Sequence, residues 1–167
     1  MAGSSMPYAS IKGEVPYGHA PSIRQLPGGI RMHHKDSTLS GIKILVVDDD
    51  PDVLAALTLI LRHYDAEVIP AAKPQEGLEQ VKRHRPDVII SDIGMPHMDG
   101  YQFIRAVRKL PPQDGGHTPA IAVTAFDRPE DRIRVSEAGF QGHLSKPVDL
   151  YELITTIAMA AGREPHG

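Results

Sequence analysis

The chain has 167 residues and a formal net charge of −3, from 18 basic and 21 acidic side chains; 41% of its residues are hydrophobic, 23% are charged and none is cysteine. This length and composition are typical of one globular domain, and the lack of cysteine excludes a disulfide scaffold and any Cys-ligated metal site. No apolar run approaches the roughly 20 residues of a membrane span, and the N-terminus lacks a secretory signal. We therefore expect a cytoplasmic protein without a membrane segment.

The first 40 residues differ from the remainder of the chain. They are rich in proline, carry four basic against two acidic side chains, and show no helical or strand period. This pattern predicts a flexible tail or linker at 1–40, followed by a folded domain at 41–162 and a short C-terminal tail at 163–167. The part after residue 40 has 14 basic and 19 acidic side chains. An acidic domain argues against direct binding of nucleic acid.

From Lys43 onwards, short apolar runs alternate with amphipathic segments. The pattern predicts strands at 44–47, 67–69, 88–90, 120–123 and 142–145, and helices at 51–64, 74–85, 101–110, 128–138 and 149–161. We expect Asp127 to cap the fourth helix, and we expect Leu150 of the last helix to face inward. Continuous apolar strands joined by helices predict an α/β fold, a doubly wound, five-stranded parallel sheet with helices on both faces.

Chemically active side chains follow four of the predicted strands. Asp48 and Asp49 follow the first, Asp92 the third, Thr124 the fourth and Lys146 the fifth. The carboxyl ends of parallel strands meet at one edge of the sheet, where ligands bind near a switch point in strand order. Clustered carboxylates repel one another, and Mg²⁺ is typically held by carboxylates together with phosphate oxygens. Because an aspartate can also accept a phosphoryl group, the sequence predicts Mg²⁺-dependent phosphoryl transfer at this edge.

Four motifs stand in a characteristic order along the chain. They are Ile44-Leu45-Val46-Val47-Asp48-Asp49-Asp50, Ser91-Asp92-Ile93-Gly94-Met95-Pro96 with Met98-Asp99-Gly100, Thr124-Ala125, and Lys146-Pro147. Together they resemble the receiver domain of two-component response regulators, over about residues 43–162. The resemblance implies a flavodoxin-like strand order of 2-1-3-4-5.

The resemblance also implies a role for each residue of the acidic group. Asp92 would accept the phosphoryl group, and it would ligate Mg²⁺ as well. Asp49 would ligate Mg²⁺ directly, Asp48 would assist through water, and the backbone carbonyl of Gly94 would complete the protein ligands. Lys146 would contact the phosphoryl group, with a cis peptide bond to the proline that follows it.

Four positions concern the lifetime of the phosphoryl group and its readout. Thr124 would bind the phosphoryl group and couple it to a conformational shift. Gly94 stands where the family often has asparagine, and Phe126 follows Thr124 by two residues. We expect Gly94 and Phe126 to set the phosphoryl lifetime. His143 replaces the aromatic residue that rotates in the family's switch, and it can change charge near neutral pH.

Partners follow from the same resemblance. The phosphoryl donor would be a sensor histidine kinase or a histidine phosphotransfer protein. A downstream protein would read the face built by residues 128–161, with the chain a monomer or a phosphorylation-linked dimer. No enzymatic activity is expected beyond the chain's own phosphorylation and its slow autodephosphorylation. Few residues follow Gly162, so no DNA-binding helix is expected after it. A free-standing regulator and the terminal receiver of a hybrid histidine kinase both remain open.

Two other functions fit parts of the pattern. A haloacid-dehalogenase-like phosphatase would use Asp48 as its nucleophile, and the Asp48-x-Asp50 pair matches the opening of that motif. However, Asp52 stands where that class has threonine or valine. A receiver that serves only as a docking scaffold, without phosphorylation, is the third reading. The first two readings differ in which aspartate becomes phosphorylated, Asp48 or Asp92.

Overall fold

The computed structural model describes residues 37–163. Its elements are β1 (Lys43–Val47), α1 (Pro51–His63), β2 (Glu67–Ala71), α2 (Pro74–His84), β3 (Val88–Asp92), α3 (Gly100–Arg108), a 3₁₀ turn (Pro112–Asp114), β4 (Ala120–Thr124), α4 (Pro129–Ala138), β5 (Gly142–Ser145) and α5 (Leu150–Ala160). Every predicted strand and helix is present, with its ends within two residues of the prediction. Over these residues, no helix has the length and apolar character needed to cross a bilayer.

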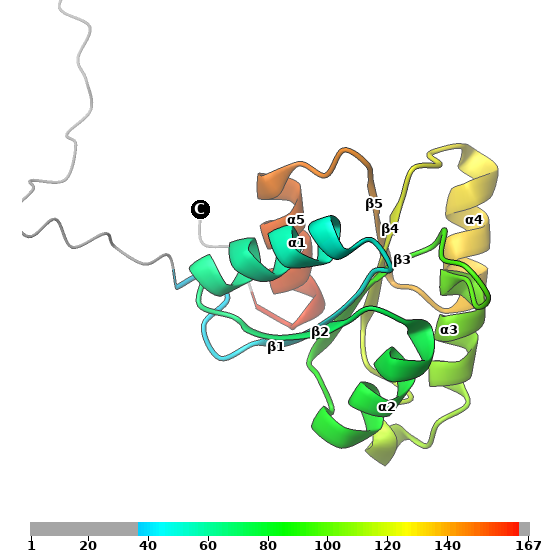
Figure 1. Cartoon of the computed structure of the whole chain (residues 1–167), viewed down its shortest axis with the longest axis horizontal. Coiled ribbons are helices and arrows are strands. Elements are labelled where there is room, and N and C mark those ends of the chain that lie inside the picture. The colour runs from blue at the N-terminus through cyan, green and yellow to red at the C-terminus, as the bar shows by residue number, and fades with distance from the viewer. Residues whose placement is uncertain (1–36, 164–167) are drawn as a thin grey trace, which may run out of the picture. The chain divides into compact units, whose positions relative to one another are not determined.

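The strands form one parallel sheet in the order β2-β1-β3-β4-β5. The direction in which successive strands are added to the sheet reverses between β1 and β3, which lie side by side near the middle of the sheet (Figure 1). This is the switch point where ligands bind in doubly wound sheets. The predicted fold class and strand order are confirmed.

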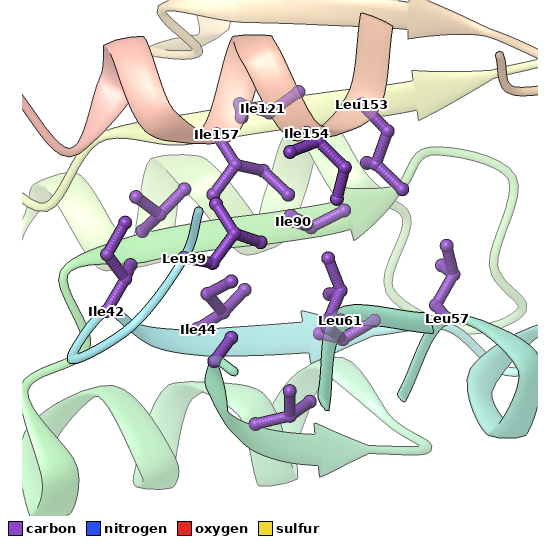
Figure 2. Close-up of a cluster of buried hydrophobic side chains, with 14 of the residues drawn as sticks. Leu39, Ile42, Ile44, Leu57, Leu61, Ile90, Ile121, Leu153, Ile154 and Ile157 are labelled. Atoms are coloured by element: carbon purple, nitrogen blue, oxygen red, sulfur yellow. The ribbon is translucent and has the colours of Figure 1, made fainter. Parts of the chain in front are cut away.

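Side chains of each inner strand alternate between two apolar clusters, one on each face of the sheet. Ile44 and Val46 of β1 join the cluster under α1 and α5, whereas Leu45 and Val47 join the cluster under α2, α3 and α4. Figure 2 shows the first cluster, in which leucines and isoleucines of α1 and α5 gather over the sheet. Each fully buried side chain of this size contributes roughly 1.5–3 kcal/mol to folding. The central strands are therefore firmly fixed, and so are the residues at their ends.

The packed domain begins before β1. Leu39 is fully buried in the α1/α5 cluster, and its backbone N–H donates to the carbonyl of Tyr64 at 3.0 Å. Gly41 closes the preceding turn with a φ of 75°, a conformation that favours glycine. Leu39 thus belongs to the domain, although it falls within the predicted tail at 1–40. The remainder of that tail, residues 1–36, and residues 164–167 lie outside the described part of the chain.

One inward-facing residue is predicted wrongly. Leu150 is 43% exposed, whereas Leu153, Ile154 and Ile157 of the same helix are buried. Asp149 caps α5 by accepting a hydrogen bond from the N–H of Glu152 at 2.8 Å, so Leu150 is the first helical residue. At that position the chain is only entering the helix, and the side chain points to solvent.

Candidate functional site

Three carboxylates meet where β1 and β3 end. Asp48 and Asp49 directly follow β1, and Asp92 is the last residue of β3. One oxygen from each lies within 4.8 Å of the others. Asp48 and Asp92 are buried, 2% and 8% exposed, whereas Asp49 is open to solvent. The structure thus brings together the acidic residues singled out from the sequence.

Backbone hydrogen bonds fix the direction of these carboxylates. Asp48 Oδ1 accepts from the N–H of Asp50 at 2.9 Å, and Asp92 Oδ1 accepts from the N–H of Ile93 at 2.8 Å. Asp50 in turn caps α1 through the N–H groups of the next turn, and Pro51 fits the first helical position because it needs no donor there. The turn after β1 therefore both starts a helix and aims carboxylates.

Lys146 is the cation of the site. It follows β5, and its Nζ lies 3.2 Å from Asp92 Oδ1 and 3.9 Å from Asp48 Oδ2. Its backbone N–H donates to the carbonyl of Thr124 at 2.8 Å, which ties it to the neighbouring strand. The peptide bond between Lys146 and Pro147 is cis, as the resemblance implies.

One ammonium does not balance three carboxylates. The pKa of Asp48 is raised above its ordinary value, mainly by burial and further by the charges of Asp92 and Asp49. The hydrogen bond from Asp50 and the charge of Lys146 act in the opposite direction without cancelling the rise. Hard oxygen ligands with excess negative charge are the donor set that Mg²⁺ prefers. The residues present therefore fit a bound Mg²⁺ ion.

The rim of the site contains the hydroxyl of Thr124, the open space beside Gly94 and the exposed ring of Phe126. Thr124, the last residue of β4, is 2% exposed, and its Oγ1 accepts from the N–H of Phe126 at 3.0 Å. Gly94 lies two residues past Asp92, and a Cβ added there would meet no atom within 4 Å. Phe126 is 62% exposed. The side of the site next to Gly94 is therefore open to water.

Gly100 has a structural role at the start of α3. A Cβ at this position would overlap the backbone carbonyl of Asp92 and come within 2.8 Å of Ile93 Cα. Asp99 caps α3 reciprocally with Gln102. The start of α3 can thus pack directly against the end of β3 only because residue 100 has no side chain.

Asp127 does not cap α4, contrary to the prediction. The helix begins at Pro129, and the first-turn carboxylate of Asp131 accepts from the N–H of Arg128 at 3.3 Å. Asp127 Oδ1 instead accepts from Arg132 at 3.0 Å (Nε) and 2.7 Å (Nη2), and meets His143 Nε2 at 3.2 Å. These contacts, Arg132 first, hold the pKa of Asp127 below its usual value. No sequence signal pairs residue 127 with residue 143, because sheet packing alone brings them together.

A buried aspartate pair with a lysine and a threonine, at the carboxyl edge of a 2-1-3-4-5 sheet, defines the class of receiver domains. The family model of the response regulator receiver domain matches residues 44–158. The chain therefore belongs to the response regulator receiver family of two-component signalling.

Similar proteins span several contexts. An uncharacterised 14.6 kDa protein of Leptolyngbya boryana is 44% identical over 120 residues, covering 72% of this chain and 90% of that protein. The transcriptional regulatory protein PrrA of Mycobacterium tuberculosis is 36% identical over 73% of this chain, which spans about half (51%) of its length. The receiver domain of the sensor histidine kinase PA1611 of Pseudomonas aeruginosa, solved with magnesium in its active-site cleft, is 30% identical, with a TM-score of 0.67. That match covers 74% of this chain and 99% of that one.

Proposed function

We propose that this chain is a phosphoacceptor module of a two-component phosphorelay. Asp92 takes a phosphoryl group from the phosphohistidine of a sensor histidine kinase or a histidine phosphotransfer protein, with Mg²⁺ as cofactor. The observation that carries this proposal is the contact of 3.2 Å between Lys146 Nζ and Asp92 Oδ1, inside a cluster of carboxylates. An ammonium placed against an acceptor carboxylate suits an incoming phosphoryl group, whose charge it offsets.

The transfer balances with few participants. A carboxylate oxygen of Asp92 forms a bond to phosphorus, the bond from phosphorus to the donor's imidazole nitrogen breaks, and the imidazole leaves neutral after taking up a proton. Asp92 Oδ1 is already held by the N–H of Ile93 and by Lys146. These bonds leave Oδ2 as the attacking atom and fix its direction. Such positioning accounts for most of the catalysis in phosphoryl transfer.

Mg²⁺ would be held by Asp49, by Asp92, by the backbone carbonyl of Gly94, and by Asp48 through water. When bound, the ion supplies positive charge that offsets the phosphoryl oxygens. Burial keeps Asp48 and Asp92 out of bulk water, so charges act more strongly on one another here than at the surface. Lys146 then binds a phosphoryl oxygen directly.

The output of the module is a change of surface. Thr124 would donate its hydroxyl hydrogen to the phosphoryl group while it still accepts from Phe126. We infer that Thr124 and His143 then pass the change to the face of α4, β5 and α5. This face exposes Ile133 and Tyr151, which are 60% and 78% exposed. A downstream protein or a second phosphorylated copy would bind there.

The chain would act in the cytoplasm, where sensor kinases present their phosphohistidine. It would catalyse only its own phosphorylation and slow autodephosphorylation, and no direct contact with nucleic acid is expected. The part of the predicted tail that precedes Leu39 would serve as a linker to the domain. The geometry favours Asp92 over Asp48 as the acceptor, because Lys146 Nζ lies 3.2 Å from Asp92 Oδ1 but 3.9 Å from Asp48 Oδ2.

Phosphorylation by acetyl phosphate, read by intact mass, tests the proposal. We expect one phosphate on the wild type with Mg²⁺ and none with a chelator. The Asp92→Asn variant should lose it, and the Asp48→Asn variant should lose it only in part. Phosphate that persists in Asp92→Asn and disappears in Asp48→Asn would instead support the phosphatase reading. A wild type that neither binds Mg²⁺ nor takes up phosphate would be a docking scaffold.

A further inference from the structure

The loop that follows β4 connects Thr124 to Asp127 over a short stretch of backbone. At its start, Thr124 Oγ1 accepts from the N–H of Phe126 at 3.0 Å, and the Thr124 carbonyl accepts from the N–H of Lys146 at 2.8 Å. The next residue after Phe126 is Asp127. Any displacement of the Thr124 hydroxyl therefore reaches Asp127 through a single hydrogen bond and two peptide units.

Asp127 joins two further elements through one atom. Its Oδ1 accepts from Nε and Nη2 of Arg132, which lies in α4, and it meets Nε2 of His143, which lies in β5. A contact between Nε2 and a carboxylate oxygen requires a hydrogen on that nitrogen. Because three contacts share one oxygen, any movement of Asp127 changes its contacts with both α4 and β5.

Little else holds this part of the molecule. None of residues 125–134 is buried, and α4 buries only Val135 and Ala138, in its second half. That second half has its own anchor, because Arg108 of α3 donates twice to the carbonyl of Gly139 at the end of α4. Near the middle of α4, the guanidinium of Arg134 lies 4.4 Å from the centre of the Tyr101 ring.

The contacts of Arg132 and Arg134 connect α4 to different parts of the molecule. The Arg134 contact leads to Tyr101 of α3 and passes through neither Thr124 nor Asp127. The Asp127 contacts lead through the loop to Thr124 and so to the phosphoryl site. We propose that Asp127 is a positioning residue that transmits the state of Thr124 to α4 and β5 together, through Arg132 and His143 separately. This proposal rests on the proposed function for its trigger, the phosphorylation of Asp92.

Backbone amide exchange of the full chain, measured with Mg²⁺ before and after addition of acetyl phosphate, tests this path. In the wild type, phosphorylation should change protection in both α4 and β5. In Asp127→Ala, Asp92 should still become phosphorylated, as checked by intact mass. The change in both elements should fall by at least about fivefold, within the roughly 2- to 30-fold range of such coupling. A merely structural role would alter exchange equally with and without phosphate.

Single variants separate the two branches. Arg132→Ala should abolish the response of α4 and keep that of β5, whereas His143→Ala should keep that of α4 and weaken that of β5, to which Ser145 also links Asp127. Arg134→Ala is the matched control, because it removes the other contact of α4 and should keep both responses. The proposal is overturned if Asp127→Ala responds like the wild type, or if Arg134→Ala loses the responses as fully as Asp127→Ala does.

A phosphate-free test distinguishes failure of this proposal from failure of the proposed function. Thr124→Val removes the hydroxyl that accepts from Phe126 and keeps the side-chain shape. It should change amide exchange in α4 and β5 of the otherwise wild-type chain, and it should have no such effect in Asp127→Ala. Equal effects in both backgrounds would refute the path, whatever the outcome of the phosphorylation assay.

Discussion

Replacing Asp48 with asparagine should stabilise the metal-free protein. The carboxylate is 2% exposed, and the pKa of Asp48 is raised, with burial as the largest cause. The folded state thus favours the neutral form of this side chain, which asparagine imitates. Asparagine also keeps an oxygen that can accept from the N–H of Asp50, as Asp48 Oδ1 does at 2.9 Å.

The size of the effect follows from opposing charges. Carboxylate oxygens of Asp48 and Asp92 that lie within 4.8 Å of each other repel by at least about 3.5 kcal/mol at an effective dielectric constant of 20. Lys146 at 3.9 Å attracts Asp48 by about 4.3 kcal/mol on the same scale. These contributions nearly cancel, which leaves the cost of removing Asp48 from water and the weaker repulsion from exposed Asp49. We expect Asp48→Asn to gain about 1–2 kcal/mol, or several degrees in Tm.

The dependence on pH has a definite sign. Because the pKa of Asp48 in the folded state lies above its ordinary value of 3.8, the folded protein keeps a proton that the unfolded chain has lost. The free energy of unfolding of the wild type therefore falls as pH rises from 3.8 to the raised pKa. Above that pKa, Asp48 causes no further change. The advantage of Asp48→Asn should accordingly be absent at low pH, grow through this window and remain constant at neutral pH.

Urea unfolding in a chelator and in Mg²⁺ provides the assay. At a Mg²⁺ concentration of ten times its Kd, the wild type should gain about 1.4 kcal/mol. Asp48→Asn should gain much less, because it has lost one of the charges that attract the ion. A variant that is less stable than the wild type in chelator would refute the electrostatic reasoning. Glu130→Gln, which removes an exposed carboxylate outside the cluster, serves as the control.

Four other substitutions test the structure further. Gly100→Ala should lose about 3 kcal/mol in urea unfolding, because its Cβ would overlap the carbonyl of Asp92. Arg108→Met should lose about 3 kcal/mol or more, because the guanidinium donates five hydrogen bonds to backbone and side-chain oxygens. Gly94→Asn and Phe126→Ala should change the rate of phosphate loss from Asp92, followed by intact mass; unchanged rates in both would contradict their assignment to the phosphoryl lifetime.

Much of the fold can be predicted because its strands are strongly apolar. Val88, Ile89 and Ile90 make an uninterrupted apolar run, which is typical of a strand covered on both faces. The site follows from the fold, since residues at strand ends must converge. Helix ends are less predictable: the spacing of Leu150 from Leu153, Ile154 and Ile157 suits an inward face, yet at the first helical position its side chain reaches solvent.

Asp127 shows what a sequence pattern cannot contain. An aspartate shortly before a helix is a normal cap, and local statistics favour that interpretation. The alternative partner, His143, becomes a neighbour only because β5 pairs with β4, with His143 opposite Ala122. Such a contact depends on sheet register and on the path of one loop. Residues that couple elements are therefore harder to predict than residues that line a strand end.

The proposed phosphoryl site and its proposed readout lie in parts of the molecule with very different packing. Asp48 and Asp92 extend from β1 and β3, whose inner residues are almost all buried on both faces. Helix α3 buries five residues beside them, whereas α4 buries two. Repulsion among the carboxylates is therefore not relaxed by moving their strands, and it is relieved by protonation or by binding of a cation. The loosely packed α4, held to Thr124 through Asp127, is the element that can respond at little cost to the core.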